Sequence, residues 1–436
     1  MSIAALYLLS SCSENTAYKK EISDPLLYCK TVKKLNDIVL ENNFPPMIAA
    51  RNYAYANIAA YEVIAAGDST YISLSGQIKH LPPMPKPSKE EKIDFQFAAL
   101  LAFCKVGNAV TFPEGSMDEY VKELKQKADD AGMPSSIFDN SVAYGNKVAD
   151  SILSWSKKDN YAQTRSSTKY TVTTEDGRWV PTPPMYAQAV EPHWMEIRPL
   201  VLDSACQFKP VRPPKFEPMN KSGEYYKALM LVMNTVDSLN DEQKHIADFW
   251  DDNPFKLNVT GHVMYGTKKF SPAGHWMNIV GIIAQKKNAD FNETVCAYAK
   301  ASIALFDGFI SCWDEKYRSN YVRPETVINK YYNPDWRPYI QTPPFPEYTS
   351  GHAVISAAAA EVMTDIFGDN ISYTDTSETE FGIPPRSFTS VRNAAVEAGM
   401  SRVYGGIHYK HSCDIGTAEG KLVGDLVNQR LHMMKK

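Results

Sequence analysis

The sequence predicts an all-α fold built from packed helical bundles. Apolar residues recur at helical spacing through most of the 436 residues, which is the pattern of helices that bury one face. Almost no stretch shows the apolar and polar alternation of a half-buried strand. The length allows one large helical domain or two bundles. Together these observations favour helix packed on helix.

The composition is that of an ordinary globular protein. Apolar residues make up 44% and charged residues 22% of the chain, close to typical values. The formal net charge of −4 gives no reason to expect a nucleic-acid partner. No apolar run approaches the roughly 18 residues of a membrane-spanning helix, so we expect none. The oligomeric state stays open.

The N-terminus resembles a bacterial lipoprotein signal. A short apolar segment, Ile3 to Leu9, is followed by Leu-Ser-Ser-Cys, which ends at Cys12. Residues 1–11 are therefore predicted to be a signal segment, with lipid attached to the Cys12 thiol of an exported, membrane-anchored protein. Residues 12–24 are predicted to be a polar tether. The alternative is an ordinary apolar N-terminus, because the usual basic residues are missing.

Helical apolar stripes define a first part of the chain. They occur at 44–67, 94–110 and 135–159, so residues 25–160 are predicted to form an N-terminal helical layer. Residues 161–222 contain many prolines and several aromatic residues, which predicts a long ordered connection. Six further cysteines allow up to three disulfides or buried free thiols, and their spacing matches no zinc pattern: Cys29, Cys104, Cys206, Cys296, Cys312 and Cys413.

Residues 223–436 are predicted to form a second, C-terminal helical bundle. Helical patterns resume there and continue to about residue 432. The last helix carries small residues on one face, which would let a neighbouring helix approach closely; they are Gly416, Gly420 and Gly424. The run of alanines at 357–360 would allow the same on another helix.

A proline-rich loop that runs into a helix, residues 344–363, has the features of an anion site. Thr349 or Ser350 can cap the helix, and Gly351 lets a ligand approach the backbone. The first N–H groups of a helix have no internal partners, and its dipole is positive there. His352 would stand beside the anion as a proton donor or acceptor. An ordinary capped helix would look the same.

Two more polar clusters lie in the second half of the chain. Lys316 and Arg323 are seven residues apart, two helical turns, so we expect them to share a helix face. Arg402 precedes His408 by six residues. The helix between them is predicted to end at two glycines, Gly405 and Gly406.

Together the three clusters favour an oxyanion site. Arginine side chains bind two oxygens of a tetrahedral anion at once, and a helix N-terminus adds N–H donors. Each cluster alone has an ordinary explanation, since paired basic residues usually face solvent and a lone histidine is usually structural.

The three motifs, K-x6-R-P, P-x3-S-G-H and S-R-x5-H, resemble those of the vanadium-dependent haloperoxidase and type 2 phosphatidic acid phosphatase superfamily. The resemblance covers residues 240–430. It implies an active site in the C-terminal bundle, with a vanadate or phosphate cage made by Lys316, Arg323, Ser350, Gly351 and Arg402. His408 would be the vanadium ligand or a phosphohistidine-forming nucleophile, and His352 the acid–base group.

Several other positions bear on this resemblance. The phosphatase pattern has an aspartate four residues after the nucleophilic histidine, but Ser412 occupies that position and the acid is Asp414. Trp313 and Phe345 resemble the halide-side aromatic residues of chloroperoxidases, although both could be core residues. The resemblance also suggests that one of two acids pairs with Arg402, namely Asp251 or Asp252. His275 is expected to be a packed or capping residue without chemistry.

The resemblance makes one function the leading hypothesis, and two alternatives stay open. The leading hypothesis is a haloperoxidase that binds vanadate, uses Lys316 to polarise hydrogen peroxide and oxidises a halide. The second is an acid phosphatase that cleaves a small phosphoester through His408. The third is a lipoprotein that binds an oxyanion without catalysis.

Overall fold

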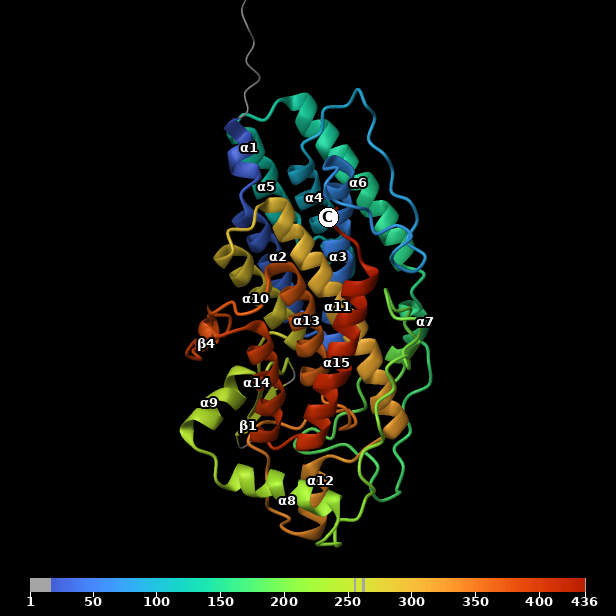
Figure 1. The fold of residues 1–436 in the computed structure, drawn as a ribbon, viewed down its shortest axis with the longest axis vertical. Coiled ribbons are helices and arrows are strands. Elements are labelled where there is room, and N and C mark those ends of the chain that lie inside the picture. The colour runs from blue at the N-terminus through green and yellow to red at the C-terminus, as the bar shows by residue number, and fades with distance from the viewer. Residues whose placement is uncertain (1–16, 255, 261–262, 436) are drawn as a thin grey trace, which may run out of the picture.

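The computed structural model describes residues 17–254, 256–260 and 263–435. It confirms the all-α class, and most helices run roughly along the long axis of the molecule (Figure 1). The first part of the chain contains these helices: α1 (Ala17–Ile22), α2 (Pro25–Glu41), α3 (Pro46–Gly67), α4 (Phe95–Val110), α5 (Asp118–Asp130), α6 (Ser135–Ser156) and α7 (Tyr161–Thr164). Residues 165–223 contain one further short helix, η1 (Trp194–Glu196).

The second part contains the helices that carry the sequence motifs. They are α8 (Glu224–Asp237), α9 (Asp241–Phe249), α10 (Pro272–Lys286), α11 (Phe291–Ser319), α12 (Pro324–Tyr331), α13 (Gly351–Phe367), η2 (Thr379–Phe381), α14 (Val391–Tyr404) and α15 (Lys410–Arg430). Two short antiparallel hairpins were not predicted; they pair β1 (Lys256–Thr260) with β2 (Val263–Thr267), and β3 (Tyr373–Asp375) with β4 (Arg386–Phe388).

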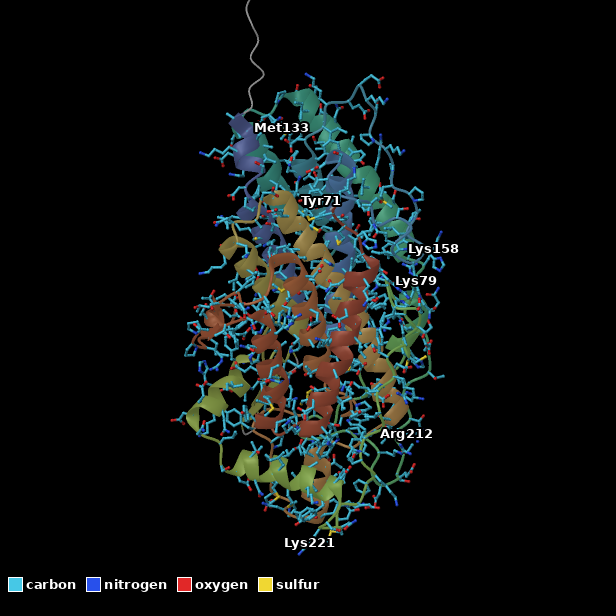
Figure 2. All side chains as sticks on the ribbon, in the orientation of Figure 1. Tyr71, Lys79, Met133, Lys158, Arg212 and Lys221 are labelled. Carbon is cyan, nitrogen blue, oxygen red and sulfur yellow. The ribbon has the colours of Figure 1, made fainter. Side chains whose placement is uncertain are left out.

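Helix α11 forms the centre of the molecule. It packs on α3 from the first part of the chain and on α13 from the second. By length and composition α11 could cross a membrane, but its apolar stretch is wholly buried inside the protein. One hydrophobic core runs through both parts. Charged residues such as Lys158 and Lys221 project from the outside (Figure 2).

The connection over residues 161–222 is ordered and packs against the helices, as its aromatic residues predicted. Trp179 and Trp194 are fully buried. The buried carboxylate of Asp307 on α11 accepts hydrogen bonds from three consecutive backbone N–H groups of the connection, those of Leu200, Val201 and Leu202, at 2.7, 2.7 and 2.8 Å. The connection is therefore fixed to the central helix.

Close packing of α13 on α15 confirms the prediction from the glycine spacing. A Cβ atom added at Gly420 would lie 1.9 Å from the Val354 carbonyl oxygen, and one at Gly424 would lie 2.8 Å from that of Ala358. Such distances are far inside van der Waals contact, so only glycine allows this approach. The contact matters for the site, because α13 begins beside His352 and α15 begins just after His408.

The N-terminal predictions lie mostly outside the described residues. The signal segment and Cys12 fall within residues 1–16, which the structure does not describe. Within the predicted tether, α1 is a packed helix whose Tyr18 and Ile22 are buried. The other six cysteines are all free thiols.

Candidate active site

A pocket opens beside the N-terminus of α13, and most of the expected residues lie on its wall. Those that line it are Trp313, Phe345, Gly351, His352, Arg402, His408, Asp251 and Asp252. The first part of the chain also reaches the pocket, through Pro46 at the start of α3. Lys316, Arg323 and Ser350 lie behind this wall, each fully buried.

His408 is held by a carboxylate, Glu347, that the sequence motifs did not predict. Its Nδ1 lies 2.7 Å from Glu347 Oε1, and its Nε2 lies 3.1 Å from Arg323 Nη1. Burial and the nearby charges of Arg323 and Lys316 hold the pKa of His408 well below its usual value, so the ring is neutral. With Nδ1–H donating to Glu347, Nε2 accepts a hydrogen bond from Arg323. Its lone pair can bind a metal or attack an electrophile once that contact is exchanged.

The expected orienting positions after His408 do not perform this role. Asp414 is half exposed and forms an ion pair with Lys410 at 2.7 Å. Ser412 is buried and makes no hydrogen bond to the His408 ring among the described residues; its hydroxyl instead faces Glu347, where it opposes the rise in pKa that burial gives this carboxyl group. In the sequence, Glu347 is the single acidic residue between Pro346 and Ser350. No motif links it to His408, so its role could not be predicted.

Arg323 reaches the site in a different way from that predicted. Helix α11 ends at Ser319, and its cap Asn320 has a left-handed φ of 49°. Arg323 is therefore the N-cap residue of α12, because the following Pro324 favours extended backbone before it. The predicted shared helix face with Lys316 is wrong. Arg323 nevertheless meets the site, where it also donates to the Phe345 and Ile407 carbonyls.

Lys316 supports the loop that leads into α13. Its Nζ donates to the carbonyl oxygens of Pro346, Glu347 and Thr349 at 3.0, 3.0 and 2.6 Å. These contacts use all three ammonium donors. Burial lowers the pKa of Lys316 to about 8, so at neutral pH it still brings a positive charge to the site.

The N-terminus of α13 has the free donors that the sequence predicted. Ser350 is the N-cap residue, but its side chain forms no capping bond, and its buried hydroxyl has no hydrogen-bond partner among the residues that the structure describes. A Cβ atom at Gly351 would meet only Trp313 Cζ3, at 3.6 Å. The first turn of α13 is thus open toward the pocket, and its N–H groups and hydroxyl can bind an anion.

His352 faces the pocket as a neutral imidazole. Its Nε2 lies 3.5 Å from Asp252 Oδ2, at the outer limit of a hydrogen bond. Burial, together with the charge of Arg402, lowers the pKa of His352 to about 4. The ring can therefore accept a proton from a molecule bound in the pocket.

Arg402 is fixed by backbone carbonyls and not by the predicted carboxylate. Its guanidinium donates to the carbonyl oxygens of Trp250 and Asp251. The Asp251 carboxylate instead faces Lys256 at 3.1 Å, and Asp252 faces the two histidines His275 and His352. Arg402 thus contacts the segment after α9 through backbone carbonyls and not through the suggested ion pair. It still lines the pocket.

Two aromatic rings form the apolar side of the pocket. Trp313 and Phe345 lie 5.0 Å apart between ring centroids. Both are nearly buried, as core residues would be, and both also line the pocket. His275, expected to be packed without chemistry, stacks on Trp250 at 4.6 Å and does not line the pocket.

The residues fit a tetrahedral oxyanion. Two buried guanidinium groups and the charge of the Lys316 ammonium act on the neutral His408. The Ser350 hydroxyl, which has no hydrogen-bond partner among the described residues, lies at the N-terminus of α13. Such donors match vanadate and phosphate equally, since both anions present several oxygens to a fixed array.

Comparisons with known proteins agree with this site. A family model described as the VCPO second helical-bundle domain matches residues 297–436. The chain is 44% identical to a solved bacterial vanadium-dependent iodoperoxidase, with a TM-score of 0.89 over 95% of this chain and 98% of the other. No curated protein matches it.

More distant structures share the fold. Holo and apo forms of a bacterial vanadium-dependent chloroperoxidase are 18% identical to the chain, with TM-scores of 0.67 and 0.68. Each match covers 89% of this chain, and 92% and 94% of the other. With the identity to the iodoperoxidase spanning nearly both whole chains, the protein is an enzyme of the vanadium-dependent haloperoxidase superfamily.

Proposed function

We propose that this haloperoxidase-like enzyme binds vanadate on His408 and oxidises iodide with hydrogen peroxide. One observation carries the binding of an oxyanion at His408: the ring is neutral and buried, with Nδ1 on Glu347 and Nε2 among cationic donors. Vanadate is chosen over phosphate because the 44% identical relative is vanadium-dependent. Iodide is chosen because the 44% identical relative is an iodoperoxidase. When bound, vanadate supplies a Lewis-acidic centre that activates peroxide toward halide.

The protein's own part is to hold charge in place. Arg323, Arg402 and the N-terminus of α13 offset the negative charge of the oxyanion, and Ser350 adds a hydroxyl donor. Glu347 binds the Nδ1 side of His408 and so leaves Nε2 as the unprotonated nitrogen. These groups are fixed before the anion arrives, so little reorganisation is needed.

Two residues have proposed roles in the reaction itself. His352 would take up and hold a proton from peroxide in the pocket; its low pKa of about 4 keeps the ring unprotonated at neutral pH and therefore ready for this role. Lys316 keeps the loop over residues 346–349 in position and adds positive charge. It polarises bound peroxide only if one of its carbonyl contacts is exchanged.

The aromatic wall formed by Trp313 and Phe345 suits a weakly hydrated anion. A large, polarizable halide gives up its water at lower cost than a small one, so an apolar wall favours iodide over chloride. The phosphatase alternative has no comparable support, although the same cage would bind phosphate and Glu347 would orient a nucleophilic His408 equally well.

The first experiment uses residues 17–436 freed of bound anions. We expect iodide oxidation by peroxide only after orthovanadate is added, and no vanadate binding or oxidation in His408→Ala. Circular dichroism checks that this variant is folded. Phosphoester hydrolysis by the anion-free protein, inhibited by vanadate and without halide oxidation, would instead identify a phosphatase.

We also propose that the protein is exported and held at a membrane by lipid on Cys12. The Leu-Ser-Ser-Cys sequence supports this assignment. The full chain expressed in a bacterium should incorporate labelled fatty acid and partition into detergent. Cys12→Ser should do neither, and equal labelling of both forms would refute the anchor.

A further inference from the structure

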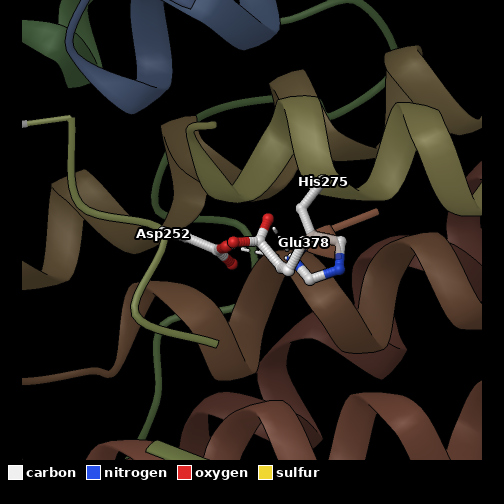
Figure 3. A group of neighbouring side chains, drawn as sticks. All are labelled: Asp252, His275 and Glu378. Carbon is white, nitrogen blue, oxygen red and sulfur yellow. Dashed lines mark hydrogen bonds and ion pairs between the residues drawn. The ribbon is translucent and has the colours of Figure 1, made fainter. Parts of the chain in front are cut away.

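A second polar cluster lies behind the pocket wall. It contains Asp252 from the segment after α9, His275 on α10, Asp375 at the end of β3 and Glu378 just before η2. All four side chains are buried, and three of them converge in Figure 3. The cluster thus joins three segments that are far apart in the sequence.

The potential ligand atoms are close together. His275 Nδ1 lies 2.9 Å from Asp252 Oδ1 and 3.8 Å from Glu378 Oε1. One ligand atom from each of the three residues lies within 4.8 Å of the other two. Ligands about 2.1 Å from a shared tetrahedral ion would lie roughly 3.4 Å apart, so one ion can span them with small adjustments.

The unexplained member of the cluster is Glu378. Its side chain is fully buried, and within the described part of the chain neither carboxylate oxygen has a hydrogen-bond partner. Nearby Lys269 is directed elsewhere, since its Nζ donates to the Asp248 carbonyl at 2.9 Å. An unpaired buried carboxyl group costs several kcal/mol whether it is ionised or neutral. Hydrogen bonds within the cluster therefore do not explain why the Glu378 carboxyl group is buried there.

We propose that Asp252, His275 and Glu378 bind a divalent metal ion. One imidazole nitrogen with carboxylate oxygens is a donor set for Zn²⁺ or Mn²⁺. His275 would bind through Nδ1, because its Nε2 is 2.9 Å from Asp375 Oδ2. A carboxylate on the second ring nitrogen is the usual support of a metal-binding histidine. Asp375 is itself held by the Ser377 backbone N–H at 2.9 Å.

The ion has a structural role in this proposal. It would join the β3–β4 region to α10 and to the pocket segment that contains Asp252. The second oxygen of Asp252 lies 3.5 Å from His352 Nε2, so the ion would also fix one neighbour of the pocket histidine. It is separate from the oxyanion at His408 and touches none of the cage residues.

The test measures metal in the whole enzyme, purified without chelators or metal-affinity resin. Elemental analysis should find about one Zn²⁺ or Mn²⁺ per chain, whatever the vanadium content. Glu378→Gln should lose the ion and melt at lower temperature, and Asp375→Asn should bind it about 10- to 100-fold more weakly. Glu380→Gln, an exposed change two residues away, should do neither.

Glu378→Gln also distinguishes the proposal from a metal-free cluster. Without a metal, Glu378 would be a neutral acid, and its neutral amide isostere would leave the melting temperature unchanged or higher. Three results would each overturn the site. They are an unchanged or higher melting temperature in Glu378→Gln, wild-type protein without stoichiometric metal, and full retention of the metal by Glu378→Gln. Because the readouts are metal content and melting temperature, failure of the iodoperoxidase assignment would not affect them.

Discussion

At the scale of single residues, His408, the proposed vanadium ligand, depends on a partner 61 positions before it in the chain. Glu347 Oε1 accepts from His408 Nδ1 and also from the Tyr409 backbone N–H, at 2.7 and 3.0 Å. It therefore fixes both the ring and the backbone beside it. Removing it would leave the imidazole free to rotate or to change tautomer.

We expect Glu347→Ala to weaken vanadate binding about 10- to 100-fold, as loss of a carboxylate behind a metal-bound histidine does. Titration of the anion-free protein with orthovanadate measures this. Asp414→Asn is the matched control, because it removes an acid close in sequence that points to Lys410. Equal affinity in both variants would show that Glu347 does not orient His408.

A second buried carboxyl group predicts how stability depends on pH. Glu419 accepts from Ser311 Oγ and Thr349 Oγ1 at 2.6 and 2.7 Å. Burial raises the pKa of Glu419 from 4.5 to about 7. The hydrogen bonds and the charge of Lys316 oppose this rise, whereas the charge of Asp314 adds to it. The folded state thus holds a proton that the unfolded state releases. Its stabilisation is complete below pH 4.5 and is lost as pH rises through 7.

Glu419→Gln should remove this pH dependence, since the amide does not titrate. The unfolding free energy of the wild type relative to the variant should fall by on the order of 3 kcal/mol between pH 4.5 and pH 8. Urea unfolding of both proteins across that range measures the difference. A constant difference would mean that Glu419 is ionised throughout.

Sequence patterns identified the cage residues at this scale but not all of their contacts. Arg402, His352 and His408 lie on the pocket as expected. Glu347 and the carbonyl partners of Lys316 could not be foreseen, because these contacts depend on the tertiary path of one loop. The same applies to Asp252, which meets two histidines and not the expected arginine.

At the scale of elements, the spacing of the two histidines depends on how closely α13 and α15 approach. The Gly416, Gly420 and Gly424 stripe lies against the Ser350, Val354 and Ala358 backbone. This periodicity was readable in the sequence because glycine at every fourth position marks one helix face. The end of α11 could not be read from the sequence, because it depends on the left-handed conformation of Asn320, which composition does not specify.

Gly420→Ala should therefore be strongly destabilising, because its methyl group would overlap the Val354 carbonyl. We expect overpacking to lower the free energy of unfolding by about 1–3 kcal/mol or more. Vanadate binding should also weaken, because α13 would shift. Gly399→Ala in α14 is the control, since its added Cβ would meet nothing closer than 3.5 Å. Thermal melts that show equal stability for the two variants would contradict the packing argument.

At the scale of the whole molecule, the two predicted parts do not have separate cores. Apolar periodicity shows which face of a helix is buried but not which helix covers it. The structure shows that α11 is covered by α3 on one side and by α13 on another. Pro46, at the start of α3, also lines the active pocket. The N-terminal part therefore contributes to the wall of the pocket that the C-terminal part forms.

This arrangement predicts that residues 223–436 will not fold alone, even though they contain every expected cage residue. Without α3, the buried apolar side of α11 would be exposed to water over much of its length, a loss far larger than the net stability of a domain. The isolated fragment should bind a hydrophobic dye and unfold without cooperativity. Co-expression with residues 17–222 should restore a cooperative transition and vanadate binding. A fragment that unfolds cooperatively and binds vanadate by itself would show instead that the C-terminal bundle is an independent domain.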